Sequence, residues 1–332
     1  MHISSSYNLT RHSIDQKKGH YESFFQRANH PVEPLAFWIR YTIFNPNNHP
    51  EDAIGELWAI YFDGRTNKHV SVKSEFPMSN CQFSKSSLEA QIGESILNDK
   101  SLKGLAFSGQ DHIKWDLTFS GKETPLLLLP SKYYNISFPK AKALVGLPLA
   151  SYTGHLTVNE EEIAIDNWVG SQNHNWGSQH TDRYAWGQVA GFDNNLDSFL
   201  EIATAQIKLG MIYSPKMTIA VLRHNGIEYL FNSLGKSIMN KATYRYFEWD
   251  FELSNGSERL SGKIRADKQN VVGLNYYNPP GGNKTCLNTK IASADVKLTT
   301  KDNESIILTT NNRAAFEILT NDTSHGIKVG DT

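Results

Sequence analysis

The feature that most constrains the fold of this chain is an alternation of side-chain character with a period of two residues. Residues 35–44 read LAFWIRYTIF, and residues 55–64 read GELWAIYFDG and end in an Asp-Gly turn signal. As an extended strand, the first segment would place Leu35, Phe37, Ile39, Tyr41 and Ile43 on one face and Ala36, Trp38, Arg40, Thr42 and Phe44 on the other. Both faces are largely apolar, as expected for strands that are covered on two sides.

Strand-like runs continue along the chain with turn signals between them, whereas helical periodicity is rare. Two segments, LRHNGIEY and LSNGSERL, place Asn-Gly between β-rich flanks, which is a strong hairpin signal. The best helix candidate is short, YESFFQRANH at residues 21–30. At the common spacing of about 8–12 residues for a strand and its turn, the sequence predicts an all-β, mainly antiparallel protein with about eighteen to twenty strands.

So many strands seldom form one sandwich or barrel without splitting. We therefore predict an N-terminal segment with a short helix over residues 1–34. A first β-barrel domain is expected over residues 35–180 and a second over residues 181–332, since each has the size of a closed barrel of eight or more strands.

Charge, cysteine content and missing motifs argue against several classes of protein. The 33 basic and 34 acidic residues nearly cancel, so no nucleic-acid partner is expected. No segment approaches the roughly 20 apolar residues of a membrane helix, and the first residues lack the apolar run of a signal peptide. We therefore expect a cytoplasmic protein without an integral membrane segment. Cys81 and Cys286 are far apart, which disfavours a disulfide framework or a cysteine-based zinc site. The sequence motifs of serine hydrolases, zincins, nucleotide enzymes and dehydrogenases are also missing.

The densest group of chemically useful residues is NHNWGSQHTDRYAWGQ, residues 173–188. If YAWGQVAGF forms a strand, Tyr184, Trp186 and Gln188 share a bulky face, and the opposite face is nearly bare. A bare strand face allows another backbone or a ligand to approach closely. His174 and Trp176, just upstream, share a face in the same way.

These residues resemble a known family. NWG at 175–177, followed by WGQ at 186–188 and by SFLEIATAQIKLG, resembles the motif region of tocopherol cyclases and is similar to that of the related carotenoid 1,2-hydratases, which has the form Asp-His-x-Trp-Gly. WDFELSNGSERLSGKIRA, VVGLNYYNPPGGNKTCLNTKIASADVKL and the early LAFWIRYTIF and GELWAIYFDG resemble further segments of this lipocalin-like superfamily, so the likeness covers most of the chain.

The resemblance implies two lipocalin-like antiparallel β-barrel domains, in agreement with the strand count. It also implies that an acid protonates a C=C bond of a prenyl lipid and that a hydroxyl group or water captures the cation. Fungal Diels–Alderases of similar build extend the range to ring closure without proton transfer.

One position departs from the hydratase motif. His174 and Trp176 match it, but Asn173 stands where the acidic residue is expected. The possible substitutes are Glu201, Asp182 and Asp166, and we favour Glu201 because it interrupts the apolar run SFLEIATA.

We therefore expect an enzyme that binds an elongated hydrophobic molecule (prenyl, polyene or polyketide-like) and catalyses its cyclisation or hydration. The alternative is a non-catalytic carrier of a lipid or pigment. Alkene protonation needs a protonated acid in a dry pocket, with aromatic faces to stabilise the cation. The catalytic candidates are His174, Glu201 and Trp176, and the ligand-binding candidates are Tyr184, Trp186, Gln188, Trp38, Arg40 and Trp58. Gln188 would hydrogen-bond a hydroxyl or carbonyl group of the ligand.

No cofactor is expected, since acid-initiated chemistry requires none. No metal is expected either, because His174 and His180 lie six residues apart without a matching carboxylate pattern. The sequence leaves a homodimer as one possible oligomeric state.

Each candidate also has a structural interpretation. Trp176 and Trp186 would then be core aromatics, and His174 a hydrogen-bonded structural histidine. His180 and Asp182 would be solvated residues of a hairpin connection.

Arg40 and Glu56 interrupt otherwise apolar strands, and such charges are seldom buried unpaired. The default interpretation is a salt bridge between adjacent strands. The sharper hypothesis is that Arg40 grips an oxyanion of the ligand. A structural protein with a closed core, related to stress, is a third alternative for the whole chain.

Overall fold

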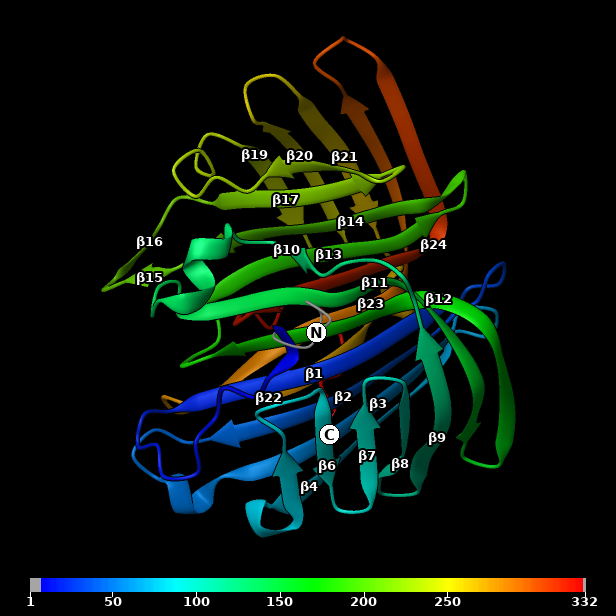
Figure 1. Cartoon of the computed structure of the whole chain (residues 1–332), viewed down its shortest axis with the longest axis vertical. Helices are drawn as coiled ribbons and strands as arrows, with labels where there is room; N and C mark the ends of the chain where they lie inside the picture. The colour runs from blue at the N-terminus through cyan, green and yellow to red at the C-terminus, as the bar shows by residue number, and fades with distance from the viewer. Residues whose placement is uncertain (1–6, 331–332) are drawn as a thin grey trace.

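The computed structural model describes residues 7–330 as β-strands joined by loops and short 3-10 turns (Figure 1). Within that range no helix reaches seven residues. The helical turns of three or more residues are η2 (Pro50–Asp52), η3 (Met78–Asn80), η4 (Ser131–Asn135) and η5 (Lys268–Asn270). The prediction of an all-β chain is therefore confirmed.

Twelve strands form the first sheet. Its order is β4-β3-β2-β1-β12-β11-β9-β8-β7-β6-β5, with β10 paired to β11. The strands are β1 (His20–Asn29), β2 (Leu35–Asn45), β3 (Ile54–Asp63), β4 (Lys68–Pro77), β5 (Cys81–Phe83), β6 (Glu89–Ile92), β7 (Ser95–Asn98), β8 (Ser101–Ser108), β9 (Asp111–Ser120), β10 (Leu126–Leu127), β11 (Ala141–Val158) and β12 (Glu161–Gly177).

This sheet curves into a nearly closed barrel. Between β4 and β8, which are not paired in the sheet, Lys73 N donates to Ser108 Oγ at 3.1 Å and Phe107 N donates to Ser74 Oγ at 2.9 Å. Serine hydroxyl groups thus bridge the strands where the barrel closes. One apolar cluster that includes Trp115 fills the interior.

Ten strands form the second sheet. Its order is β18-β17-β14-β13-β24-β23-β21-β20-β19, with β22 paired to β23. The strands are β13 (Arg183–Phe192), β14 (Asn195–Gln206), β17 (Met217–His224), β18 (Ile227–Phe231), β19 (Lys241–Arg245), β20 (Glu248–Ser254), β21 (Arg259–Arg265), β22 (Val272–Tyr277), β23 (Asn283–Thr299) and β24 (Ser305–Thr320). A separate hairpin contains β15 (Lys208–Leu209) and β16 (Ile212–Tyr213).

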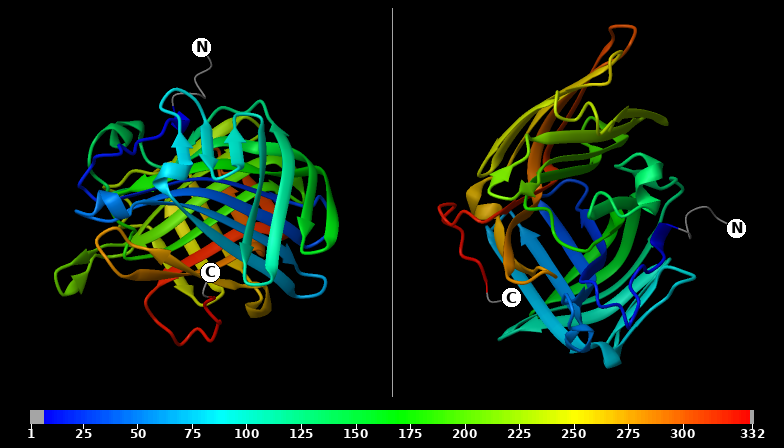
Figure 2. Two further views of the ribbon diagram at one scale, coloured as in Figure 1. Left: turned by 90° about the horizontal axis from the view of Figure 1, so that it is seen from below. Right: turned by 90° about the vertical axis from the view of Figure 1, so that its left-hand side faces the viewer.

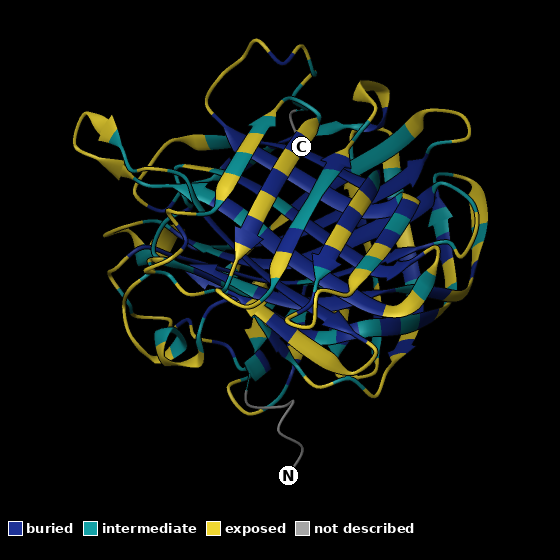
Figure 3. Ribbon diagram, turned by 90° about the horizontal axis from the view of Figure 1, so that it is seen from above, coloured by how far each residue is buried: buried dark blue, intermediate teal, exposed yellow. Residues whose placement is uncertain are grey.

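The two sheets pack against each other around long strands (Figure 2). β11, β12, β23 and β24 have 16–18 residues each; β12 and β24 are buried over their C-terminal halves, and β23 is buried over residues 286–292. Outlying strands such as β20 instead alternate buried and exposed residues (Figure 3). The chain passes from one sheet to the other between Gly177 and Arg183. The domain bounds near residue 180 stay a prediction.

The short helix predicted over residues 21–30 is wrong, because these residues form β1 in the middle of the first sheet. Phe24 and Gln26 point into the barrel, and Phe25 and Arg27 point towards the second sheet. A strand covered on both faces usually appears as a continuous apolar run, but β1 buries the polar residues Glu22, Gln26 and Arg27 and lacks this signal.

Candidate functional site

The candidate residues of β12 lie on two faces of the first sheet. His174 and Trp176 lie on the barrel side, with ring centroids 4.6 Å apart. Asn173 points towards the second sheet, where its Oδ1 accepts a hydrogen bond from Gln188 Nε2 at 2.8 Å. Successive side chains of a strand alternate between faces. The structure therefore separates His174 and Trp176 from Trp186, Gln188 and Glu201.

His174 is fully buried, and both of its ring nitrogens have partners. Nε2 lies 2.8 Å from Glu22 Oε1, and Nδ1 lies 2.9 Å from the carbonyl oxygen of Tyr7. Both ring nitrogens are therefore occupied by contacts within the protein. The ring also stacks on Phe24 at 4.3 Å. This geometry favours the structural interpretation of His174.

Glu22, which the sequence reasoning missed, supplies the carboxylate that Asn173 lacks. Its carboxylate accepts hydrogen bonds from Arg11 N at 2.8 Å and His12 N at 2.9 Å, and it lies 3.0 Å from His20 Nε2. Burial raises the pKa of Glu22, but the hydrogen bonds from His174 and His20 outweigh it and hold the pKa below its usual range. The β1–β12 register sets Glu22 opposite Trp176, two residues from His174, and this long-range pairing has no signal in the local sequence.

Between the sheets lies a second polar group, the intersheet cluster of Arg27, Ser171, Asn173, Gln188 and Glu201. Gln188 stands at its centre. Its Nε2 donates to Asn173 and to Glu201 Oε2 at 2.8 and 2.7 Å, and its Oε1 accepts from Arg27 Nε and Ser171 Oγ at 2.6 and 2.7 Å. All four hydrogen-bonding positions of the amide are occupied. Gln188 therefore holds Glu201 in place and has no position left for a ligand.

Glu201 is buried, and its Oε1 accepts a hydrogen bond from Trp186 Nε1 at 2.8 Å. Burial raises the pKa of Glu201 to about 7, although the hydrogen bonds from Trp186 and Gln188 favour the ionised form. A carboxyl group with a pKa near neutrality can both hold and deliver a proton. Trp186 is partly exposed, so the residue that holds this acid is not fully enclosed by the protein.

A buried ion pair lies on the other side of Trp186. Lys290 Nζ lies 2.7 Å from Glu317 Oε1, and 5.4 and 5.6 Å from the ring centroids of Trp186 and Trp38. Burial lowers the pKa of Lys290 against the opposing effect of Glu317. The hydroxyl of Tyr184 lies 3.4 Å from Glu317 Oε2. Tyr184, Trp186 and Trp38 thus border one charged region, and no sequence pattern indicated Lys290 or Glu317.

Arg40 and Trp58 lie opposite each other in β2 and β3, on the face of the first sheet that meets β22. The guanidinium carbon of Arg40 lies 4.6 Å from the ring centroid of Tyr276. The expected salt bridge between Arg40 and Glu56 does not form. Glu56 instead makes an ion pair with Lys73 of the neighbouring strand β4, with 2.8 Å between Nζ and Oε1.

His180 is buried, and the expectation of a solvated turn residue is wrong. Its ring stacks on Tyr21 at 4.0 Å and on Tyr276 at 5.6 Å. Burial and the nearby charge of Arg40 lower the pKa of His180 to about 3, so the ring is neutral at physiological pH.

The two other candidate acids lie nearer the surface than Glu201. Asp182 accepts a hydrogen bond from Lys208 N at 2.8 Å, and Asp166 is exposed and bonded to the side chain of Asn167. Of the three, Glu201 alone is buried.

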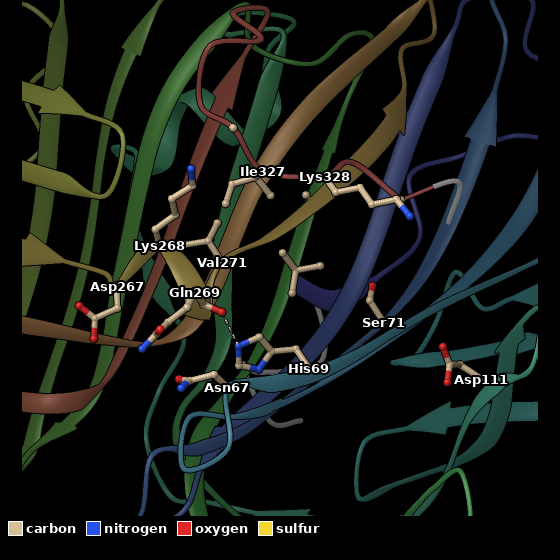
Figure 4. A pocket seen from close by; sticks show the side chains of 14 residues that line it. Asn67, His69, Ser71, Asp111, Asp267, Lys268, Gln269, Val271, Ile327 and Lys328 are labelled. Atoms are coloured by element: carbon tan, nitrogen blue, oxygen red, sulfur yellow. Dashed lines mark hydrogen bonds between the residues drawn. The ribbon is translucent and has the colours of Figure 1, made fainter.

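Two cavities lie away from the intersheet cluster. A groove of about 1060 Å³ between β4 and η5 is lined by residues that include His69, Ser71, Lys268, Gln269, Ile327 and Lys328, with His69 Nε2 3.0 Å from Gln269 O (Figure 4). A smaller cavity of about 210 Å³ is bordered by Trp176. That volume is below the roughly 300–1,000 Å³ of most ligand pockets.

Two further findings concern the described residues. They contain one cluster of three side chains able to hold a metal ion, His49, Glu51 and Asp52, and all three are exposed. None of their helical segments has the length and apolar character needed to cross a membrane.

Comparison with models of protein families found no match. Two curated proteins of Mycobacterium tuberculosis, from strains CDC 1551 and H37Rv and both described as uncharacterised, are 24% identical to this chain over 187 residues. The match covers 56% of this chain and 56% of each relative. The chain thus spans about half the length of the curated relatives that it matches.

Two solved structures superpose on nearly the whole chain. An AttH-like protein from Nitrosomonas europaea has a TM-score of 0.56 at 12% identity, over 91% of both chains. Kievitone hydratase from Nectria haematococca has a TM-score of 0.57 at 12% identity, over 92% of this chain and 89% of its own. At this identity the likeness concerns the fold. The chain therefore shares the overall fold of these two proteins.

Proposed function

We propose that the protein binds an elongated hydrophobic small molecule between its two sheets and catalyses acid-initiated hydration or cyclisation, with Glu201 as the proton donor. The observation that carries the proposal is a buried carboxyl group with a pKa near 7 that is hydrogen-bonded to a half-buried tryptophan. Carboxyl groups of this kind serve as general acids in enzymes.

The surroundings of Glu201 suit such a reaction. Glu201 gives its proton to one carbon of a C=C bond, and the positive charge develops on the other carbon. Aromatic faces attract this charge; Trp186 and Phe25 meet edge to face at 6.2 Å, and Phe25 lies 6.3 Å from Trp38. Water, or a hydroxyl group of the same molecule, then bonds to the cation, and its proton returns to Glu201.

Similarity of fold supports the same class of reaction, because kievitone hydratase shares this architecture. Fold alone does not determine the reaction, so the argument depends on Glu201.

One observation favours a carrier as the second candidate. The position expected to be acidic is Asn173, whose amide oxygen accepts a hydrogen bond from Gln188. A carrier needs no acid at this position.

The test uses isotopes to separate the reactions. Purified protein is incubated with a hydrophobic extract of the source organism in H₂¹⁸O and, separately, in D₂O, and the products are followed by mass spectrometry. Hydration adds one ¹⁸O-labelled water, whereas cyclisation keeps the formula and introduces one deuterium.

Glu201→Gln should lose product at least about 100-fold, the usual contribution of a general acid. Glu162→Gln, an exposed change on β12, is the control and should keep wild-type rates. Full turnover by Glu201→Gln would overturn the assignment of the acid. A wild-type protein that binds a component of the extract but converts none would be a carrier.

A further inference from the structure

Arg40 is a buried cation without a counter-charge. It is 5% exposed, and its Nε donates to Ser23 Oγ at 2.8 Å. Among residues 7–330 no ion pair joins its guanidinium group to a carboxylate, the hydrogen bond to Ser23 is its only one, and its terminal nitrogens are not among the fully enclosed nitrogens that lack a partner. Other buried cations nearby have more partners: Lys290 pairs with Glu317, Lys73 pairs with Glu56, and Arg27 donates hydrogen bonds to Gln188 and Asn29. A charge that is 5% exposed and has a single hydrogen-bond partner needs an explanation.

Two more unused donors lie on the same face of the first sheet. The indole Nε1 atoms of Trp38 and Trp58 are buried and have no acceptor among the described residues. Trp38 precedes Arg40 by two positions in β2, and Trp58 is the direct partner of Arg40 across the β2–β3 register. The guanidinium carbon lies 5.8 Å from the Trp38 ring centroid. A guanidinium group and two indole N–H groups therefore share one surface that lacks acceptors.

We propose that Arg40 is the receptor for a carboxylate group and that the ligand bound between the sheets is a hydrophobic carboxylic acid. This inference rests on the proposed function and names the class of its substrate. A carboxylate is planar, and its two oxygens match the forked donors of a guanidinium group. A phosphate would bring a second negative charge, whereas the neighbouring cations Lys290 and Lys73 are already neutralised by glutamates.

The position of Arg40 connects the receptor to the proposed acid. Trp38 lies beside Arg40, Phe25 lies 6.3 Å from Trp38, and Trp186 lies 6.2 Å from Phe25. Trp186 in turn holds Glu201. A ligand whose carboxylate binds Arg40 would lay its apolar chain along these aromatic rings and bring a double bond towards Glu201.

The test compares probes with identical prenyl chains: geranylgeranoic acid, geranylgeraniol and geranylgeranyl phosphate. Affinity is measured by quenching of tryptophan fluorescence for the wild type, for Arg40→Gln, and for Arg259→Gln as an exposed control on β21. We expect the acid to bind the wild type and the control at least about tenfold more tightly than the alcohol, since a lost charge-assisted bidentate contact is worth that much. In Arg40→Gln the ratio of the two affinities should fall below about threefold.

The proposal would be overturned by equal affinity for acid and alcohol in the wild type, by no binding of either, or by an unchanged ratio in Arg40→Gln. Tighter binding of the phosphate would overturn the choice of a carboxylate.

Arg40→Met provides a readout without any ligand. If Arg40 is unpaired in the free protein, an apolar side chain of similar length should raise the midpoint of thermal unfolding, by about 2 °C or more. A lower midpoint would show that Arg40 is structural and would overturn the proposal.

The proposed function and the carboxylate receptor can fail separately. Binding of the acid without turnover of any metabolite contradicts the proposed function, and full turnover of a neutral substrate by Arg40→Gln contradicts the carboxylate receptor.

Discussion

The pH dependence of stability should differ between the wild-type protein and a Glu201→Gln variant by an amount set by the burial of this one carboxyl group. Its pKa rises from an ordinary 4.5 to about 7 in the folded protein. At about 1.4 kcal/mol for each pH unit, this difference corresponds to about 3 kcal/mol of unfolding free energy.

The sign follows from proton binding. The folded protein holds the Glu201 proton more tightly than the unfolded chain, so this contribution is fully present below about pH 4.5 and is lost as the pH rises through about 7. A glutamine does not titrate. The unfolding free energy of the wild type minus that of Glu201→Gln should therefore fall by about 3 kcal/mol between about pH 4 and pH 8, and stay constant above that range.

Urea unfolding of both proteins at each pH measures this difference. Subtraction cancels the titration of groups that both proteins share, such as His180. Glu162→Gln, matched in chemistry but exposed, should show no such trend. A flat difference between the wild type and Glu201→Gln would refute the reasoning, because the pKa of Glu201 would then be ordinary and the group would be ionised at neutral pH.

Three other predictions concern the buried charges. The pKa of His180 is lowered from 6.5 to about 3, so its contribution to stability is present above pH 6.5 and is lost as the pH falls, by up to about 5 kcal/mol. Urea unfolding of His180→Phe between about pH 7 and pH 4 should lack this loss. An equal acid dependence of unfolding in the wild type and His180→Phe would contradict the prediction. Glu22→Gln should lower the unfolding free energy at pH 7 by about 3 kcal/mol or more, since it leaves His174 and His20 without their carboxylate. Guanidinium unfolding measures this change, and a value below about 1 kcal/mol would mean that the contacts of Glu22 with the two histidines contribute little. Lys290→Met should cost about 3–5 kcal/mol by leaving Glu317 unpaired, and Lys290→Met with Glu317→Leu should recover most of the loss; additive losses in the double variant would argue against a coupled pair.

The sequence predicted the architecture where apolar and β-branched residues form strand-like runs between turn signals. These runs and the Asn-Gly turns predicted an all-β chain, and the motif at residues 173–188 indicated a fold that kievitone hydratase shares. The same reasoning missed β1, because buried polar residues such as Glu22, Gln26 and Arg27 interrupt its apolar run. Because β1 was missed, Glu22 was missed as well, since its role depends on β1 lying next to β12.

Only part of the candidate site was predicted, because only some of its residues lie close together along the chain. Glu201, Gln188 and Trp186 come from two consecutive strands, so their proximity follows from a hairpin. The proximity of the ion pair that completes this region does not follow from a hairpin. Lys290 and Glu317 lie about a hundred residues further along, and their approach depends on how β23 and β24 pack against β13 and β2. His180 looked solvated because polar residues surround it in the sequence, but the rings that bury it come from β1 and β22.

The central claim is that the ligand lies between the sheets and not inside the first barrel, and Trp176 and Trp186 distinguish the two locations. The measurement is mass spectrometry of the organic extract from freshly purified wild type, Trp176→Ala and Trp186→Ala, each first shown to be folded by circular dichroism. We predict a stoichiometric hydrophobic species in the wild type and in Trp176→Ala that is lost from Trp186→Ala. A species that is lost from Trp176→Ala and kept by Trp186→Ala would contradict the account and place the ligand on the barrel side of β12.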